Sequence, residues 1–198
     1  MLVALVAGVL LGRVSAPGSG QANPNATSAE AGFARDMQTH HAQAVDMAIL
    51  VRDATDDPEV RLLALDILTA QSQQMGQMYA WLVSWGVPQT STEPPMAWMA
   101  RPTLDGGHDE HGDAHVPGER MPGLATPEQM AALADAEGVE AERLFLELMT
   151  AHHLGGVEMA EAVLARTDLP LVTNLAAGMV AIQDKEIDYM RELLDARQ

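Results

Sequence analysis

Apolar side chains recur along this chain every three or four residues, the spacing of one face of an α-helix. One such stripe lies between about residues 29 and 55 and comprises Phe33, Met37, His40, Ala44, Met47 and Val51. A second continues to about Trp85 and comprises Leu68, Gln71, Met75, Met78 and Leu82. Asp57-Pro58-Glu59, between them, is typical of a helix start, with an N-cap and a proline in the first turn. The short turn predicts an antiparallel helix hairpin.

The last third of the chain predicts a second hairpin of the same kind. Its first stripe comprises Phe145, Met149, His152, Gly156, Met159 and Val163, and its second comprises Leu175, Met179, Gln183, Ile187, Met190 and Leu194. A turn at residues 168–170 separates them. Thr126-Pro127-Glu128-Gln129 predicts a short additional helix before this hairpin. No strand pattern competes, so the predicted fold class is all-α.

The two hairpins are copies of each other. Phe33, Met37, His40, His41, Met47 and Ala48 recur as Phe145, Met149, His152, His153, Met159 and Ala160, each displaced by 112 residues (145 − 33). The same displacement relates Pro58 to Pro170, Gln71 to Gln183 and Met78 to Met190, without an insertion. Repeats at a fixed displacement indicate an internal duplication.

This duplication predicts one four-helix bundle domain over residues 29–197, with the hairpins related by a pseudo-twofold axis. Repeat one would occupy 29–85, a long crossover loop 86–125, the short helix 126–137 and repeat two 139–197. Residues 1–28 would form an apolar start followed by a flexible tether.

The start of the chain predicts export. Residues 2–11 are a run of apolar side chains that is too short to span a bilayer but suits a secretory signal or a signal anchor. A tract rich in proline, glycine, serine and asparagine then extends to about Ser28. We expect an extracytoplasmic protein, either secreted or membrane-anchored through its N-terminus.

The composition of the chain limits the kinds of partner and metal site that it could have. The formal net charge of −17 repels nucleic acid phosphate and attracts cations. Cysteine is absent, so thiolate metal sites are excluded, and only methionine could provide a soft ligand. The chain has 13 methionines, which could equally fill the core of a protein with few aromatic residues. Association with a second copy of the chain stays open.

The paired histidines are candidate metal-binding residues. Neighbouring helical residues point about 100° apart, so we expect one histidine of each pair to face the core and the other its edge. The spacing of three residues places Met37 beside His40 and Met149 beside His152, where each pair could chelate one ion. Small residues at positions 44 and 156 leave room for Met47 and Met159. The candidate metal ligands are Met37, His40, His41, Met47, Met149, His152, His153 and Met159.

Two further groups could support such a site. The facing helices carry Gln71, Gln183, Glu186 and Met190, and their polar side chains could orient the imidazoles or simply link the helices. The crossover carries His108, His111 and His115 among acidic residues. We expect these three to be accessory, as a weak metal-binding loop or as a solvated polar loop.

Imidazole combined with thioether favours copper, and thioether favours Cu(I) in particular. A first alternative is a ferritin-like di-iron or di-manganese oxidase, which uses Glu-x-x-His motifs in a four-helix bundle. Neither repeat contains that motif, so we do not expect an enzyme. A second alternative is a structural or partner-binding bundle whose histidines belong to the core.

The motif F-x-x-x-M-x-x-H-H-x-x-x-x-x-M-A, followed by Q-x-x-E-I-x-x-M, resembles the bacterial "domain of unknown function 305" family over residues 29–197. The resemblance implies a ferritin-like four-helix bundle that is usually exported and often duplicated. It also implies copper binding or copper resistance, as suggested for some members, and no established enzyme activity. The first repeat departs from the motif, because Gln74-Met75 stands where the second has Glu186-Ile187. The crossover departs too, with Gly123-Leu124-Ala125-Thr126 in place of a Gly-Met-Met-Thr stretch.

Overall fold

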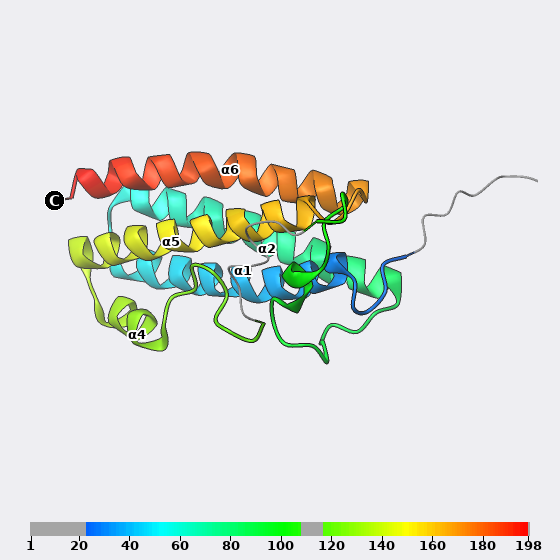
Figure 1. The fold of residues 1–198 in the computed structure, drawn as a ribbon. Coiled ribbons are helices and arrows are strands. Elements are labelled where there is room, and N and C mark those ends of the chain that lie inside the picture. The colour runs from blue at the N-terminus through cyan, green and yellow to red at the C-terminus, as the bar shows by residue number, and fades with distance from the viewer. Residues whose placement is uncertain (1–22, 108–116, 198) are drawn as a thin grey trace, which may run out of the picture.

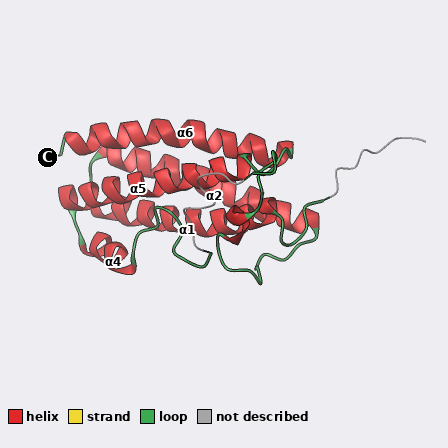
Figure 2. Ribbon diagram, viewed as in Figure 1, coloured by secondary structure: helices red, strands yellow, loops and turns green. Residues whose placement is uncertain are grey.

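The computed structural model describes residues 23–107 and 117–197, and in these ranges the chain is helical without strands (Figures 1 and 2). Its elements are α1 (Ala29–Ala54), α2 (Pro58–Trp85), the 3₁₀ helix η1 (Ala97–Ala100), α4 (Pro127–Asp135), α5 (Gly138–Leu164) and α6 (Pro170–Asp195). None of the helices in these ranges is long and apolar enough to cross a membrane. The apolar run at residues 2–11 and the three crossover histidines His108, His111 and His115 lie outside the described residues.

The four long helices form a bundle of two hairpins. α1 packs along α2, α5 packs along α6, and the hairpins meet mainly through α1 and α5 (Figure 1). The predicted all-α bundle, built from two repeated hairpins and joined by a crossover, is therefore confirmed. The histidine pairs lie on α1 and α5, the two helices that form the interface between the repeats.

Local signals set the helix boundaries. The Asp57 side chain accepts hydrogen bonds from the first turn of α2, and Thr126 and Gln129 form a capping box on α4, as the sequence predicts. Gly86 ends α2 with a φ of 72°, a left-handed conformation that favours glycine. Two details differ from expectation. Gly138, which lies between the predicted short helix and repeat two, is the first residue of α5, and the crossover, predicted as a loop, contains η1.

Two equivalent threonine–glutamate hydrogen bonds, which we call clamps, show how the repeats face each other. The Thr55 hydroxyl, after the end of α1, donates to Glu142 near the start of α5 at 2.5 Å. Thr167, after the end of α5, donates to Glu30 near the start of α1 at 2.6 Å. Both residues of one clamp are displaced by 112 from the equivalent residues of the other. The end of each inner helix thus contacts the start of the other, so α1 and α5 run antiparallel about a pseudo-twofold axis.

The core is divided into two clusters of buried side chains, one toward each end of the bundle. The first includes Phe33, Met37 and Met159, and the second includes Met47, Phe145 and Met149. Along both α1 and α5, the histidine pair falls between the residues that belong to the two clusters. The histidines therefore form a polar layer across the middle of an otherwise apolar core.

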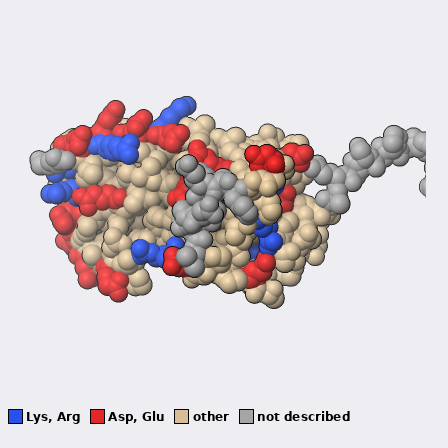
Figure 3. Space-filling view, in the orientation of Figure 1, with Lys and Arg blue, Asp and Glu red and all other residues tan. Residues whose placement is uncertain are grey.

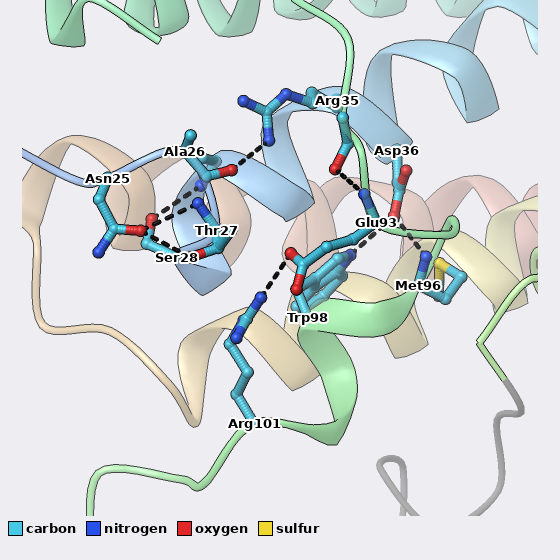
Figure 4. Close-up of polar contacts among 12 residues, drawn as sticks. Asn25, Ala26, Thr27, Ser28, Arg35, Asp36, Glu93, Met96, Trp98 and Arg101 are labelled. Carbon is cyan, nitrogen blue, oxygen red and sulfur yellow. Dashed lines mark hydrogen bonds and ion pairs between the residues drawn. The ribbon is translucent and has the colours of Figure 1, made fainter. Parts of the chain in front are cut away.

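The first half of the crossover is tied to α1 by polar contacts. Figure 4 shows the Asp36 carboxylate facing η1, where it accepts the backbone N–H of Met96 at 2.7 Å and the indole N–H of Trp98 at 2.9 Å. Burial raises the pKa of Asp36, while these two hydrogen bonds and the Arg35 charge oppose that rise. These contacts place Trp98 and Met99 in the core beside Phe33.

The last five residues of the crossover, 121–125, lie across α1 and α5, and we call them the strap. Gln43 of α1 holds it through two hydrogen bonds to the Ala125 backbone, one of 3.0 Å to the carbonyl and one of 2.7 Å from the N–H. The repeat equivalent of Gln43 on α5 is Gly155, and a Cβ there would lie 2.1 Å from the Pro122 carbonyl oxygen. One helix thus binds the strap with a side chain, and the other lacks a side chain where the strap passes.

The strap should depend on the bare backbone at position 155. We expect Gly155→Ala to lower the free energy of unfolding by about 1–3 kcal/mol, because the added methyl meets backbone that cannot rotate away. Gly178→Ala on α6 is the matched control, since a Cβ there meets nothing within 4 Å. It should be neutral or stabilising by up to about 1 kcal/mol. Urea denaturation of both variants measures the difference, and equal effects would contradict the tight strap contact.

Candidate metal centre

All four bundle histidines are buried, with exposed fractions of 0% for His40, 0% for His41, 1% for His152 and 0% for His153. The expectation that one member of each pair lies at the core edge is therefore wrong. The reason is tertiary, because α1 is covered by α5 on one side and by α2 on another, and α5 is covered in the same way by α1 and α6. Two neighbouring side chains that point 100° apart on either helix are therefore both covered by another helix.

His40 and His152 meet at the interface between the repeats. Their ring centroids are 3.8 Å apart, and the rings are tilted by 34°. His40 Nε2 lies 3.0 Å from the Pro122 carbonyl oxygen of the strap, and His152 Nε2 lies 2.9 Å from the carbonyl oxygen of His40. A carbonyl oxygen can only accept, so Nε2 carries the proton in both rings.

His41 and His153 point away from that interface, each toward the outer helix of its own hairpin. His41 Nε2 donates to the Gln74 side-chain oxygen of α2 at 2.7 Å. His153 Nε2 donates to the Glu186 carboxylate of α6 at 2.8 Å. Positions 74 and 186 are again related by 112 residues, so the contact is pseudo-symmetric.

These contacts use Nε2 and leave lone pairs on the other ring nitrogen. Nδ1 of His40, His41 and His153 is buried and has no hydrogen-bond partner in the described part of the chain. Histidines that bind metals commonly donate one N–H to a carbonyl or carboxylate and coordinate through the other nitrogen. The layer therefore has the hydrogen-bonding pattern of ligand histidines.

Three of the rings, those of His40, His41 and His152, are uncharged at neutral pH. Burial lowers the pKa of His40 from 6.5 to about 4 and that of His41 to about 3. Burial also places the pKa of His152 well below its usual value, and the nearby His40 lowers it further. Neutral imidazole is the form that coordinates a metal ion, so burial holds these three rings in the form that can bind one.

The four candidate methionines flank the layer from both sides. Met37, Met47, Met149 and Met159 are all 0% exposed. Because α1 and α5 are antiparallel, Met37 shares a cluster with Met159, and Met47 shares the other with Met149. Thioethers from opposite repeats are thus gathered at each side of the layer, an arrangement that spacing within one helix does not reveal.

The expected supporting residues lie close to the layer. Gln71 and Gln183 are buried, and the Oε1 atom of each has no hydrogen-bond partner among the described residues. A Cβ at Gly156 would lie 2.6 Å from Gln183 Oε1, so the small residue there makes room for this glutamine, whereas the sequence suggested room for Met159. Met190 is buried in the same cluster as Met47 and Met149.

Sequence reasoning missed part of the surroundings. Gln74 entered only as a departure from a motif, and Gln43 and the Pro122 carbonyl did not enter at all. The repeat displacement was the available signal for Gln74, since it aligns this residue with Glu186. No sequence signal indicates the strap carbonyl, because every residue has one.

The donor set suits a soft ion better than a hard one. Within residues 23–107 and 117–197, no group of three or more histidine, aspartate or glutamate side chains could hold a metal ion together. An ion at the layer would have to use thioether sulfur or amide oxygen beside imidazole. Sulfur and imidazole together fit copper, whereas a carboxylate-rich set would fit iron or manganese.

The surface around the bundle is acidic. In Figure 3, Asp and Glu side chains outnumber Lys and Arg on the visible face and gather at the end where the C-terminus lies. A cleft of about 620 Å³ at the junctions of α1 with α2 and of α4 with α5 has several carboxylates in its lining, namely Asp53, Asp56, Asp57, Glu137 and Glu142. Such a surface raises the local concentration of cations.

Comparison with known proteins identifies the family. The model of "Domain of unknown function (DUF305)" matches residues 30–194. The chain belongs to the DUF305 family. No curated protein matches it.

Solved structures show the same fold. A DUF305 protein from Streptomyces coelicolor, described as secreted, is 45% identical, with a TM-score of 0.76 over 87% of this chain and 96% of that one. A DUF305 fragment from Deinococcus radiodurans is 34% identical, with a TM-score of 0.67 over 87% of this chain and 99% of that one. CopM in its Cu(I)-bound form is 22% identical, with a TM-score of 0.60 over 85% of this chain and 96% of that one.

The buried neutral histidines should make stability depend on pH. The unfolded chain takes up protons below pH 6.5, whereas folded His40 does so only near pH 4. The contribution of a buried neutral histidine to the free energy of unfolding is therefore complete above pH 6.5. It falls by about 1.4 kcal/mol per pH unit for each such histidine as pH drops toward 4. Urea unfolding of metal-free protein between pH 7.5 and about 5 measures this slope.

His41→Gln removes one titrating group and should give a shallower slope of stability against pH. Unchanged stability of the unsubstituted protein from about pH 7 to 5 would contradict the burial of neutral rings.

Proposed function

We propose that this DUF305 protein binds copper at the buried histidine layer and stores, buffers or passes on the ion without catalysing turnover. The observation that carries the proposal is the set of buried imidazole lone pairs on His40, His41 and His153, flanked on both sides by methionine sulfur. The proposed ligands are Met37, His40, His41, Met47, Met149, His152, His153 and Met159.

Physical chemistry supports this assignment. A buried polar atom without a partner costs roughly 1–3 kcal/mol, so three unpaired Nδ1 atoms in one layer need a compensating role. Coordination of an ion would satisfy them. Gln71 and Gln183 would then orient the imidazoles, and Glu186 would orient His153 through its hydrogen bond. Met190 would pack beside the thioethers of Met47 and Met149.

The family comparison supports the proposal as well. CopM, which shares the fold, has been solved in Cu(I)-bound, Cu(II)-bound and Ag-bound forms. The repeated His-His and methionine motif of this chain lies inside the matched DUF305 region. The absence of Glu-x-x-His in either repeat argues against a di-iron oxidase.

Export belongs to the same proposal. The relative from Streptomyces coelicolor is described as secreted, and the apolar start of this chain suits a signal or anchor. We expect the full-length protein in the extracytoplasmic or membrane fraction of its own cells. Fractionation with a cytosolic marker tests this, and recovery from the cytosol alone would contradict export.

Metal analysis tests the central proposal. Purified protein is exposed separately to copper under reducing conditions, zinc, iron and manganese, then desalted and analysed by mass spectrometry. We expect preferential retention of Cu(I), lost in the His40→Ala/His152→Ala variant. A Met37→Leu/Met159→Leu variant should also lose Cu(I) affinity by at least about tenfold, because leucine keeps the volume of methionine without its sulfur.

Met179→Leu is the matched control for the methionine variant. Met179 is buried in the same cluster as Met37 and Met159 but is not a proposed ligand, so its replacement should leave Cu(I) affinity unchanged. Thermal melting of all variants separates loss of ligands from loss of folding. Two bound irons with consumption of dioxygen would favour an oxidase, and retention of no metal would leave a structural or partner-binding bundle.

A further inference from the structure

In the histidine layer, the contacts that His41 and His153 make with the outer helices match except for one charge. His41 and His153 are both 0% exposed, and the Nδ1 atom of each is buried without a partner in the described part of the chain. Their Nε2 atoms donate over 2.7 Å to Gln74 and over 2.8 Å to Glu186. The acceptor is thus a neutral amide in the first repeat and a carboxylate in the second.

The outer helices place the carboxylate beside solvent. Glu186 lines a groove of about 260 Å³ together with Leu62 and Leu63 of α2 and Ile182 and Tyr189 of α6. Its side chain is 20% exposed, while the His153 side chain behind it is 0% exposed. The carboxylate therefore lies between the groove and the buried ring, with its charge only partly screened by water.

A negative acceptor changes what the other ring nitrogen binds. Hydrogen bonding to a carboxylate increases the electron density on the imidazole and so strengthens Nδ1 as a ligand. The carboxylate also attracts the bound ion directly, and this Coulomb energy is twice as large for a divalent ion as for a monovalent one. A neutral amide in the same place provides neither effect.

We propose, on the basis of the function proposed above, that the two halves of the layer differ in ion preference. The half around His153 and Glu186 favours the divalent ion Cu(II), and the half around His41 and Gln74 favours the monovalent ion Cu(I). Glu186 acts here as a positioning and specificity-determining residue through His153, without contacting the ion. The duplication thus places two sites of different charge preference in one bundle.

A charge exchange between the repeats tests this inference. Full-length metal-free protein is titrated with Cu(II), and separately with Ag(I) as a monovalent probe that needs no reductant. Glu186→Gln should weaken Cu(II) binding by about 10- to 100-fold, the usual effect of removing such a partner, while Ag(I) affinity changes less than about threefold. Quantitative electron paramagnetic resonance should fall from one tightly held Cu(II) per chain toward none.

Gln74→Glu is the reciprocal variant. Its expected gain of Cu(II) binding would not occur if Glu186 only stabilised the fold. This variant should add a second tightly held Cu(II), and the double exchange Gln74→Glu/Glu186→Gln should restore one Cu(II) in the opposite half. Glu186→Asp keeps the charge and should keep most of the Cu(II) preference. Thermal melting identifies any variant that loses Cu(II) because it unfolds.

The outcomes separate this inference from the proposed function. Equal weakening of Cu(II) and Ag(I) in Glu186→Gln, or no change in Cu(II) affinity, would overturn the charge preference while leaving copper binding in place. Binding of neither ion by the unsubstituted protein would overturn the proposed function and this inference together.

Discussion

The bundle depends on a layer of buried imidazoles in the middle of its core. A buried ring N–H without an acceptor would cost roughly 1–3 kcal/mol, so four buried histidines require four acceptors. The structure supplies two of these acceptors from backbone carbonyls, one in the strap and one in α1, and two from side chains, Gln74 of α2 and Glu186 of α6. Each acceptor ties one part of the chain to the layer, and the layer in turn fixes how the two hairpins face each other.

The pseudo-twofold symmetry is followed at the ends of the bundle and broken at its centre. The threonine–glutamate clamps repeat faithfully, because both hairpins end and begin in the same way. At the centre, His152 donates to the carbonyl of His40, but His40 donates to the strap. A single crossover cannot contact both repeats in the same way. The equivalent positions 43 and 155 therefore differ: Gln43 forms hydrogen bonds with the strap, and Gly155 leaves space for it.

Much of the fold was predictable because its signals are local or repeated. Helical periodicity, the Asp57-Pro58 start and the Thr126–Gln129 capping box act over a few residues, and the structure confirms them. The duplication predicted two hairpins of the same kind, and the structure confirms them. Helix η1 was missed because its position is held by Asp36 and by burial of Trp98, which involve residues about sixty positions apart.

The sequence by itself determined which residues could do chemistry, since residue type and the 112-residue repeat select the histidines, methionines and glutamines. Only the tertiary structure decided which atoms of these side chains remain available to bind an ion. Burial of both histidines of each pair follows from helices on two sides of α1 and of α5, and periodicity describes one helix at a time. The free Nδ1 atoms and the methionines gathered from opposite repeats likewise follow from the antiparallel meeting of α1 and α5. A one-dimensional pattern cannot determine such contacts, because they join residues that only the packing of two hairpins brings together.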